Sequence, residues 1–238
     1  MHYPNVSPAV FLARPNRFVA EVLLDSVPTT VHVKNTGRCR ELLIPGCRVY
    51  VQHQPSPTRK TAYDLIAVEK GERLLNMDAN APNRIFGEYV RAGRFLRGWS
   101  VIRPETTHGD SRFDFYLESP GHRLFAEVKG VTLENDGVMR FPDAPTERGV
   151  KHLEGLARCV QEGYEAWAVF VIQTEDVRWM EPNRRTHPAF ADAMRQAAQA
   201  GYACSIEEAV SIGPTIGSHV GPGALALFFL GDENVRSK

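Results

Sequence analysis

Short runs of alternating apolar and polar residues fill the chain up to about residue 80. The runs RFVAEVLL and SVPTTVHVKN alternate with a period of two, which is typical of strands that bury one face. A further strand is expected after the turn at Pro45 and Gly46, and TAYDLIAVEKGERLLNMD predicts a hairpin that turns at residues 69–71. About five strands in so short a segment, without a long helical pattern, predict a small closed β-barrel.

The rest of the chain alternates helical and strand patterns. Helical spacing of apolar residues predicts helices over residues 83–97, 143–163 and 188–202. Two strands and a turn are expected within residues 112–130, and ACSIEEAV is expected to form a last short strand. AWAVFVIQ is a continuous apolar strand of the kind that lies central in a sheet covered on both faces. This order predicts a mixed sheet flanked by helices, so we divide the chain into a β-barrel domain, residues 1–82, and an α/β domain, residues 83–238.

Composition and charge bound this interpretation without pointing to a partner. The 238 residues carry 28 Lys and Arg against 28 Asp and Glu, so the net charge is zero and the whole chain gives no sign of a polyanionic partner. Residues 1–82 hold 10 basic and 7 acidic residues, whereas residues 83–238 hold 18 and 21, so any basic surface must be local. The four cysteines include no CxxC pair, which excludes the common zinc motifs.

No segment predicts a membrane span or a secretion signal. No run approaches the ~18 consecutive apolar residues of a spanning helix, and the first residues lack the apolar core of a signal peptide. We therefore expect a cytoplasmic protein with reduced thiols and no membrane partner. The sequence does not decide between a monomer and a homodimer.

The strands within residues 112–130 carry three charged residues where burial is expected. Glu127 and Lys129 are two apart and share one face of their strand. Asp114 lies 13 positions before Glu127, which suits an antiparallel hairpin that turns in SPGHR and brings the two carboxylates together. Such oxygens, with the Val128 carbonyl, suit Mg²⁺ or Mn²⁺, and a lysine can stabilise charge on a phosphate. Exposed ion pairs on a wet sheet face would give the same pattern, so spacing alone leaves both interpretations open.

Several motifs resemble those of one protein family. VHVKNTG, PNR before a helix, SRFDF, EVKGVTLE and above all FPDAPTERGVKHL are similar to motifs of the sugar fermentation stimulation protein A family. The resemblance extends to about residue 210, whereas residues 211–238 match no motif of the family. It implies an N-terminal OB-like barrel followed by a mixed α/β/α domain of the PD-(D/E)XK nuclease type. It also implies a DNA-binding protein with a part in regulating sugar metabolism.

The resemblance further implies roles for individual residues. It makes two carboxylates catalytic metal ligands and a lysine catalytic, namely Asp114, Glu127 and Lys129. Glu88 would offer a further carboxylate to the metal from the first helix. Lys151 and His152 match the place where related nucleases position a residue that handles phosphate or water. Ordinary helical ion pairs would explain Glu88 and Lys151 equally well.

Contact with nucleic acid requires a local track of cations. Together with Lys151 and His152, the candidates are basic residues from both predicted domains: Arg38, Arg40, Arg59, Lys60, Arg84, Arg91 and Arg112. Barrels of the OB type also stack bases on aromatic side chains. Three aromatic residues are available for this role, although each is more often part of a core: Phe18, Tyr50 and Tyr63.

Two functions remain in view. The first is a nuclease that cuts the phosphodiester bonds of DNA with Mg²⁺ or Mn²⁺. The second is a DNA-binding transcriptional regulator that keeps the nuclease fold without turnover. The joint presence of Asp114, Glu127 and Lys129 favours the first, since a pure binder has no use for a divalent-metal site. A sugar enzyme with two carboxylates as acid and base is weaker, because it gives Lys129 no task.

Overall fold

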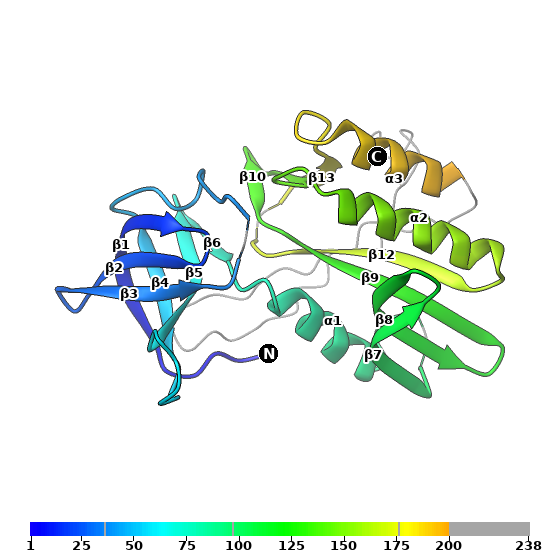
Figure 1. Cartoon of the computed structure of the whole chain (residues 1–238), viewed down its shortest axis with the longest axis horizontal. Helices are drawn as coiled ribbons and strands as arrows, with labels where there is room; N and C mark the ends of the chain where they lie inside the picture. Colours follow the sequence, from blue (N-terminus) through cyan, green and yellow to red (C-terminus); the bar gives the residue numbers. More distant parts are fainter. Residues whose placement is uncertain (36, 97, 176, 200–238) are drawn as a thin grey trace.

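The computed structural model describes residues 1–199 except residues 36, 97 and 176. Figure 1 shows a barrel joined to a second domain in which helices lie against a sheet. The strands of the barrel are β1 (Val6–Asn16), β2 (Val19–Leu24), β3 (Val27–Val33), β4 (Arg48–His53), β5 (Tyr63–Lys70) and β6 (Arg73–Asn76). The described elements of the second domain are α1 (Ala81–Arg91), β7 (Val101–His108), β8 (Ser111–Ser119), β9 (His122–Val131), β10 (Leu133–Asn135), β11 (Val138–Phe141), α2 (Glu147–Gln161), β12 (Glu165–Ile172), β13 (Trp179–Pro182) and α3 (Pro188–Gln199). The predicted strand ACSIEEAV and residues 211–238 lie outside the described residues.

The barrel forms because alternate residues of its strands point into one apolar core. Its strands are hydrogen-bonded in the order β3-β2-β1-β4-β5-β6, and β3 also pairs in parallel with β5 at Val33 and Leu65. This additional pairing closes the sheet on itself. Phe11, Val22 and Val51 are among the buried side chains that fill the interior. The predicted small closed barrel is therefore confirmed.

Strand β1 is not predicted by the sequence pattern because it contains Pro8 and Pro15. Proline cannot donate a hydrogen bond to a ladder, so it normally argues against a strand. β1 nevertheless pairs with both β2 and β4, with Pro8 opposite Tyr50. Ala9 and Phe11 point into the core, and this burial together with two neighbouring strands holds β1 in place.

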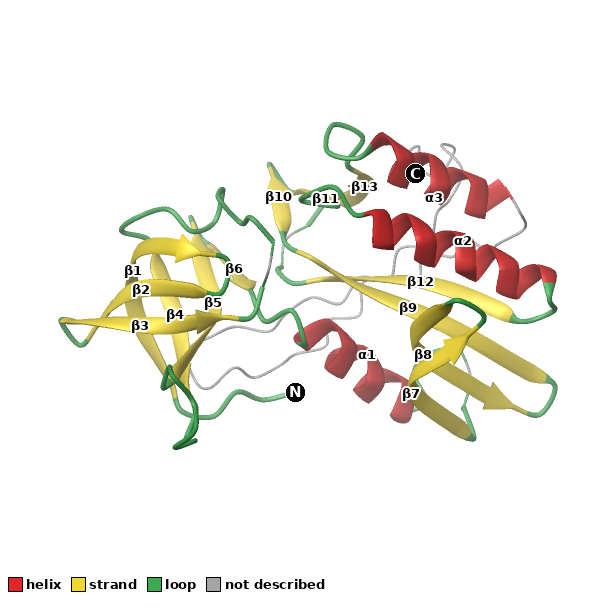
Figure 2. Cartoon of the chain, in the orientation of Figure 1, coloured by secondary structure: helices red, strands yellow, loops and turns green. Residues whose placement is uncertain are grey.

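A four-stranded sheet in the order β12-β9-β8-β7 forms the centre of the second domain. α1 packs on one face through Phe86, and α2 packs on the other through Leu156; Figure 2 shows both helices against the strands. Among the strands of the described residues, β12 stands at one end of this order, parallel to β9, and not in the centre as the run AWAVFVIQ predicts. Its continuous apolar sequence reflects helices on both faces of the sheet. β7 was hidden in the sequence by polar residues and Pro104.

Local capping signals set the ends of the helices. α1 follows Asn80 and has Pro82 in its first turn, where a missing N–H costs little. Asn83, where the apolar pattern predicts the first helix to begin, lies inside α1 instead. α2 follows Thr146, whose side chain accepts a hydrogen bond from the N–H of Gly149 over 3.0 Å. No helix within the described part of the chain is long and apolar enough to cross a membrane.

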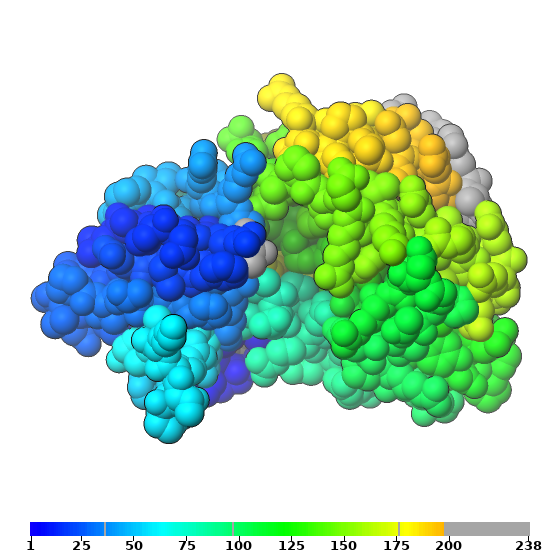
Figure 3. Space-filling model, in the orientation of Figure 1, coloured from blue at the N-terminus to red at the C-terminus, as the bar shows by residue number. Residues whose placement is uncertain are grey.

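Polar contacts fix the barrel against the second domain. Lys70 and Arg73, on either side of the β5–β6 turn, each contact a carboxylate oxygen of Glu134 at 2.8 Å, and Glu134 is only 1% exposed. The backbone N–H of Asn76 donates to the carbonyl oxygen of Gln173 over 2.8 Å. Figure 3 shows that the surface is hollowed between the two parts. A ligand entering this hollow would therefore meet both domains in a fixed arrangement.

Candidate active site

The β8–β9 hairpin carries the three charged residues predicted to form the site. Ser119 lies opposite His122, so the turn falls within SPGHR as predicted. Continued along the two strands, this antiparallel register places Asp114 beside Glu127. Asp114 Oδ2 accepts a hydrogen bond from the backbone N–H of Val128 over 2.7 Å, which ties its carboxylate to β9.

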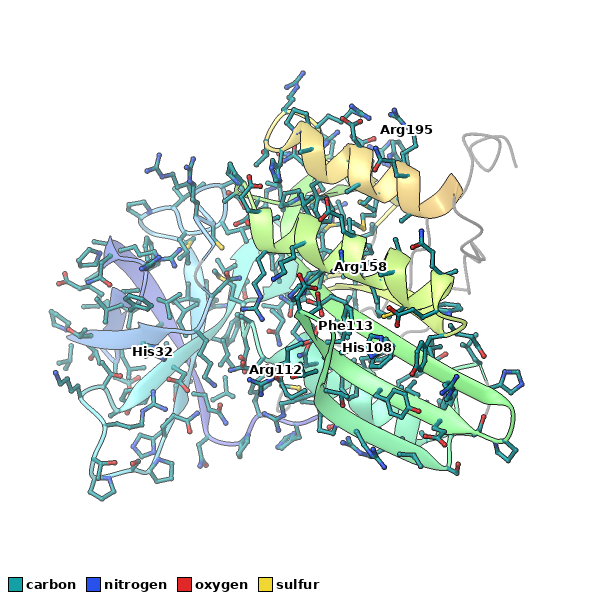
Figure 4. The ribbon with its side chains drawn as sticks, turned by 45° about the vertical axis from the view of Figure 1, so that its right-hand side comes forward. His32, His108, Arg112, Phe113, Arg158 and Arg195 are labelled. Carbon is teal, nitrogen blue, oxygen red and sulfur yellow. The ribbon has the colours of Figure 1, made fainter. Side chains whose placement is uncertain are left out.

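β8 changes face at Asp114. Phe113 packs among the residues beneath α2, whereas Phe115 packs against Phe86 of α1 on the opposite face of the sheet; Figure 4 shows Phe113 close to α2. Residues two apart on a regular strand share a face, so β8 must be irregular between these phenylalanines. The Asp114 carboxylate occupies this irregular position and reaches Asn83 Nδ2 of α1 at 2.8 Å.

Glu127 is held in a buried position by two side chains. It is 3% exposed, and its Oε1 is hydrogen-bonded to Lys129 Nζ and His152 Nδ1. Arg148 Nε donates to His152 Nε2 over 3.4 Å. Because a guanidinium can only donate, this contact leaves the ring proton on Nδ1, from where it is donated to Glu127. The second oxygen, Glu127 Oε2, is buried and has no hydrogen-bond partner among the described residues.

The pKa values of the two carboxylates shift in opposite directions. Burial acts to raise the pKa of Glu127, but the hydrogen bonds from His152 and Lys129 and the charge of Lys129 outweigh it, so the pKa is lowered. Burial and, after it, the negative charge of Glu127 raise the pKa of Asp114, against the hydrogen bond from Val128. Two carboxylates thus share one lysine, and a further cation nearby would stabilise the charged form of Asp114.

A hard divalent cation fits this donor set. Its preferred ligands are carboxylate oxygens, and Glu127 Oε2 is a buried oxygen without the partner that such atoms normally have. The set of protein ligands for the cation is small. Among the described residues, no three His, Cys, Asp or Glu side chains are grouped to hold a metal. Mg²⁺ commonly keeps several waters in its shell, so Asp114 and Glu127 could hold it together with water.

Two predicted residues depart from their expected positions. Glu88 contacts the amino group of Met1 at 2.6 Å and not the carboxylate pair. It lies five residues after Asn83 on α1, which turns it by about 140° from the side chain that reaches Asp114. His152 is 5% exposed and bonded to Glu127. It therefore supports the site from within the protein and cannot contact nucleic acid as predicted.

Most of the predicted cationic side chains are exposed, and three pair with carboxylates. Three are engaged with carboxylates of the same chain: Arg59 with Asp64, Arg112 with Glu105, and Lys151 with Asp110. Arg112 and Lys151 are nevertheless exposed, as are the remaining basic side chains: Arg38, Arg40, Lys60, Arg84 and Arg91. Arg59 departs furthest from the prediction, because its carboxylate partner has no exposed side-chain surface and fixes the guanidinium to the barrel.

Sequence reasoning does not find Asn83 and Arg148 as site residues. Arg148 precedes His152 by four residues on α2, and such neighbours share a helix face. The spacing within FPDAPTERGVKHL could therefore have indicated it. Asn83 belongs to the PNR motif, but its contact with Asp114 could not be predicted, because it depends on how α1 docks onto β8.

Comparisons with known proteins cover both parts of the chain. A family model described as the sugar fermentation stimulation protein RE domain matches residues 80–210, and one described as the SfsA N-terminal OB domain matches residues 12–77. The sugar fermentation stimulation protein homolog of Desulfitobacterium hafniense (strain Y51) is 54% identical over 201 residues, which cover 84% of this chain and 88% of that protein. The homolog of Ruminiclostridium cellulolyticum is 47% identical over 213 residues, 87% of this chain and 94% of that protein. Among solved structures, Pyrococcus furiosus SfsA in complex with Ca²⁺ has a TM-score of 0.83 and 25% identity, covering 97% of this chain and 98% of that one.

Proposed function

This chain belongs to the sugar fermentation stimulation protein family, and on that premise we propose that it binds DNA and hydrolyses phosphodiester bonds with Mg²⁺ or Mn²⁺. The observation that carries the proposal is the buried, unpartnered Oε2 of Glu127 beside Asp114, whose pKa is raised. The restriction-endonuclease-like domain supports the reaction class. The Ca²⁺ in Pyrococcus furiosus SfsA supports the kind of ion, since Ca²⁺ and Mg²⁺ both prefer oxygen ligands.

Each residue of the cluster has a task in such a reaction. Asp114 and Glu127 would hold the cation, which when bound supplies a Lewis acid for the phosphate and a water of lowered pKa. Lys129, with 20% of its side chain exposed, would stabilise the negative charge that develops on the phosphate. His152 holds Glu127 in place, and Asn83 does the same for Asp114.

The exposed cations would hold the phosphates on both sides of the scissile bond. Arg38 belongs to the barrel loop whose backbone donates to Asp143 of the second domain over 3.2 Å, and Arg40 follows it. Because local charge drives counterion release, a chain of zero net charge can still bind DNA in a salt-dependent way. Arg38→Ala and Arg40→Ala should each weaken binding and lower the slope of log affinity against log salt by about 1. An affinity that does not change with salt would contradict this part of the proposal.

A DNA-binding regulator of sugar-metabolism genes, without turnover, is the second candidate. It is favoured by the small donor set within the described residues and by the two partners that Glu127 Oε1 already has. In that case the cluster would only fix the β8–β9 hairpin. Both candidates would act in the cytoplasm, where thiols stay reduced; the cysteines of the described residues are free.

Cleavage assays separate the two candidates. Labelled DNA and RNA are incubated with Mg²⁺, Mn²⁺ or a chelator, and the wild type is expected to cut only with metal. Lys129→Ala should bind metal and DNA but lose cleavage. Glu88→Gln tests the third predicted carboxylate, and since Glu88 contacts Met1 we expect cleavage to be retained. A wild type that binds DNA and cuts neither substrate with either metal would favour the regulator.

A further inference from the structure

Phe18 is an exposed aromatic residue on a rigid hairpin. It lies between β1 and β2, and 48% of it is exposed. Its backbone is held on both sides, because its N–H donates to Asn16 Oδ1 over 2.9 Å and its carbonyl oxygen accepts from Val33 N–H over 2.7 Å. The Arg17 guanidinium lies over the ring, with Cζ 4.9 Å from its centroid. An apolar ring is thus kept in solvent at a fixed position next to a positive charge.

One arginine ties this hairpin to the loop that carries the exposed cations of the barrel. Arg14 Nη2 donates to the carbonyl oxygens of Arg17 and Asn35, over 2.9 and 2.7 Å. Its Nη1 donates to the carbonyl oxygens of Gly37 and Arg38, both over 2.9 Å. The planar, multiply donating guanidinium is suited to hold several carbonyls at once. Ring and cations therefore form one preorganised surface.

This surface lies on the side of the barrel that faces the second domain. The Arg38 N–H donates to Asp143 Oδ2 over 3.2 Å, and a Cβ at Gly37 would collide with the same carboxylate. Asp143 lies shortly before α2, the helix whose His152 holds Glu127. The β2–β3 turn, by contrast, points away from the second domain (Figure 1). A strand lying on the hairpin and the loop is therefore directed toward the carboxylate pair.

We propose that Arg17 and Phe18 form a stacking subsite for an unpaired nucleobase, so that the preferred ligand is a single-stranded nucleic acid or a single-stranded end. The inference rests on the proposed nucleic-acid function and specifies its substrate class. Bases within a duplex are already stacked on both sides, so only an unpaired base can lie on the ring. Exposed aromatics beside cations are the usual means of binding single strands, and Arg38 and Arg40 supply neighbouring charges for the phosphates.

The other aromatic residues predicted from the sequence do not offer such a surface. Tyr50 is 7% exposed and its hydroxyl donates to Glu69 Oε1 over 2.6 Å. Tyr63 is partly buried against His53, with ring centroids 5.2 Å apart. Phe18 is accordingly the member of the set whose ring is exposed to solvent.

Binding assays in the presence of a chelator test the subsite without cleavage. Full-length protein is titrated into a labelled single-stranded oligonucleotide and, separately, into a blunt duplex of the same sequence. Phe18→Ala should weaken single-strand binding on the order of 10-fold and leave duplex binding unchanged, whereas Phe18→Trp should retain both. Val27→Ala is the matched control, since Val27, the first residue of β3 at the β2–β3 turn, is 59% exposed, and it should alter neither affinity.

Two further readouts distinguish stacking from other contacts. The fluorescence of 2-aminopurine in the single strand should be quenched on binding to the wild type and not on binding to Phe18→Ala. Phe18→Leu should bind as weakly as Phe18→Ala; if it binds as the wild type does, the ring provides only an apolar contact and the subsite is refuted. A wild type that binds single strands with no effect of Phe18→Ala overturns this inference alone. A wild type that binds neither ligand overturns the proposed function as well.

Discussion

Asp64 in the barrel and Glu127 in the second domain are both buried carboxylates, 0% and 3% exposed, but their surroundings differ. Asp64 lies 3.0 Å from Lys34 Nζ and also contacts Arg59 and His32. Burial acts to raise its pKa, but the hydrogen bonds and charges of Arg59 and Lys34 outweigh it, so the pKa is lowered. A second buried carboxylate, Asp78, lies 3.4 Å from Lys34, but Lys34 and Arg59 together still outnumber it, and no further ligand is needed to explain the burial of Asp64.

The carboxylates of Asp114 and Glu127 are not compensated by positive charge to the same extent. Asp114 adds a second negative charge, and Lys129 and the His152 ring both contact the same oxygen of Glu127, Oε1. Glu127 Oε2 is left without a partner, whereas both oxygens of Asp64 are bonded. Burial of a charge therefore does not by itself indicate a site. A shortage of compensating partners does, because an unpaired buried charge is costly.

Removal of Asp64 should cause the largest loss of stability. Asp64→Ala leaves Arg59 without its carboxylate partner and Lys34 with Asp78 alone, and breaking such a buried pair costs about 3 kcal/mol. Asp114→Ala should cost less than ~1 kcal/mol, because the lost hydrogen bonds are offset by relief of its repulsion with Glu127. Urea unfolding without metal measures both. Equal losses for the two variants would remove the distinction between the clusters.

With metal present, removal of Asp114 should cost more stability than removal of Asp64. At a concentration of Mn²⁺ about 100 times its dissociation constant, the free energy of unfolding of the wild type should rise by about 2.7 kcal/mol. Asp114→Ala and Glu127→Ala should lose this gain, because each removes half of the carboxylate pair. Asp64→Asn, although destabilised, should keep it. The metal prediction is wrong if the wild type shows no rise, or if the three variants respond alike.

The fold could be predicted from the sequence wherever alternation was clear. β2, β3 and the β5–β6 hairpin follow their apolar patterns, and α2 follows its cap and its apolar face. β1 and β7 could not be predicted, because prolines and polar residues conceal strands that are defined by their neighbours. The position of β12 within the sheet could not be read either. A continuous apolar run reports burial on both faces and says nothing about strand order.

In the site, too, contacts within one hairpin could be predicted from the sequence, whereas contacts between packed elements could not. The proximity of Asp114 and Glu127 could be predicted by counting residues along a hairpin. The contact of His152 with Glu127 depends on how α2 docks on the sheet, where a Cβ at Gly155 would lie 2.7 Å from Ser111 Oγ. The direction of Glu88 depends on the packing of α1. Motifs thus identified the residues of the site, but the packing of helices on the sheet decided which of them meet.

Loss of the support beneath Glu127 should have an intermediate effect. His152→Leu fills the buried space but removes the N–H donated to Glu127, and a hydrogen bond to a charged group contributes about 2 kcal/mol. Lys151→Ala is the matched control on the same helix, since Lys151 is exposed and surface changes stay within about 0.5 kcal/mol. Urea unfolding and Mn²⁺ titration should be performed together. We expect His152→Leu to weaken metal binding and Lys151→Ala to leave it unchanged; equal effects would show that His152 has no special role.

The smallest effect expected is a difference in pH dependence between Asp114 and Asp64. The folded-state pKa of Asp114 is raised, so its contribution to stability is present below its unfolded value of 3.8 and is lost as the pH rises through the folded value. Asp64 has the opposite sign, because its pKa is lowered and its contribution is lost as the pH falls.

Asp114→Asn resembles the protonated carboxyl and isolates this effect. With a chelator present, the variant should gain stability relative to the wild type as the pH rises from about 3 through the raised pKa of Asp114, and the difference should then level off. Asp64→Asn should instead lose stability relative to the wild type over the same range. Thermal unfolding at a series of pH values measures both differences. If the two differences have the same sign, the carboxylates of the barrel and of the second domain are not in the contrasting environments that the structure shows. Addition of Mn²⁺ should abolish the gain of Asp114→Asn, because the cation favours the charged form of Asp114 that the variant cannot adopt.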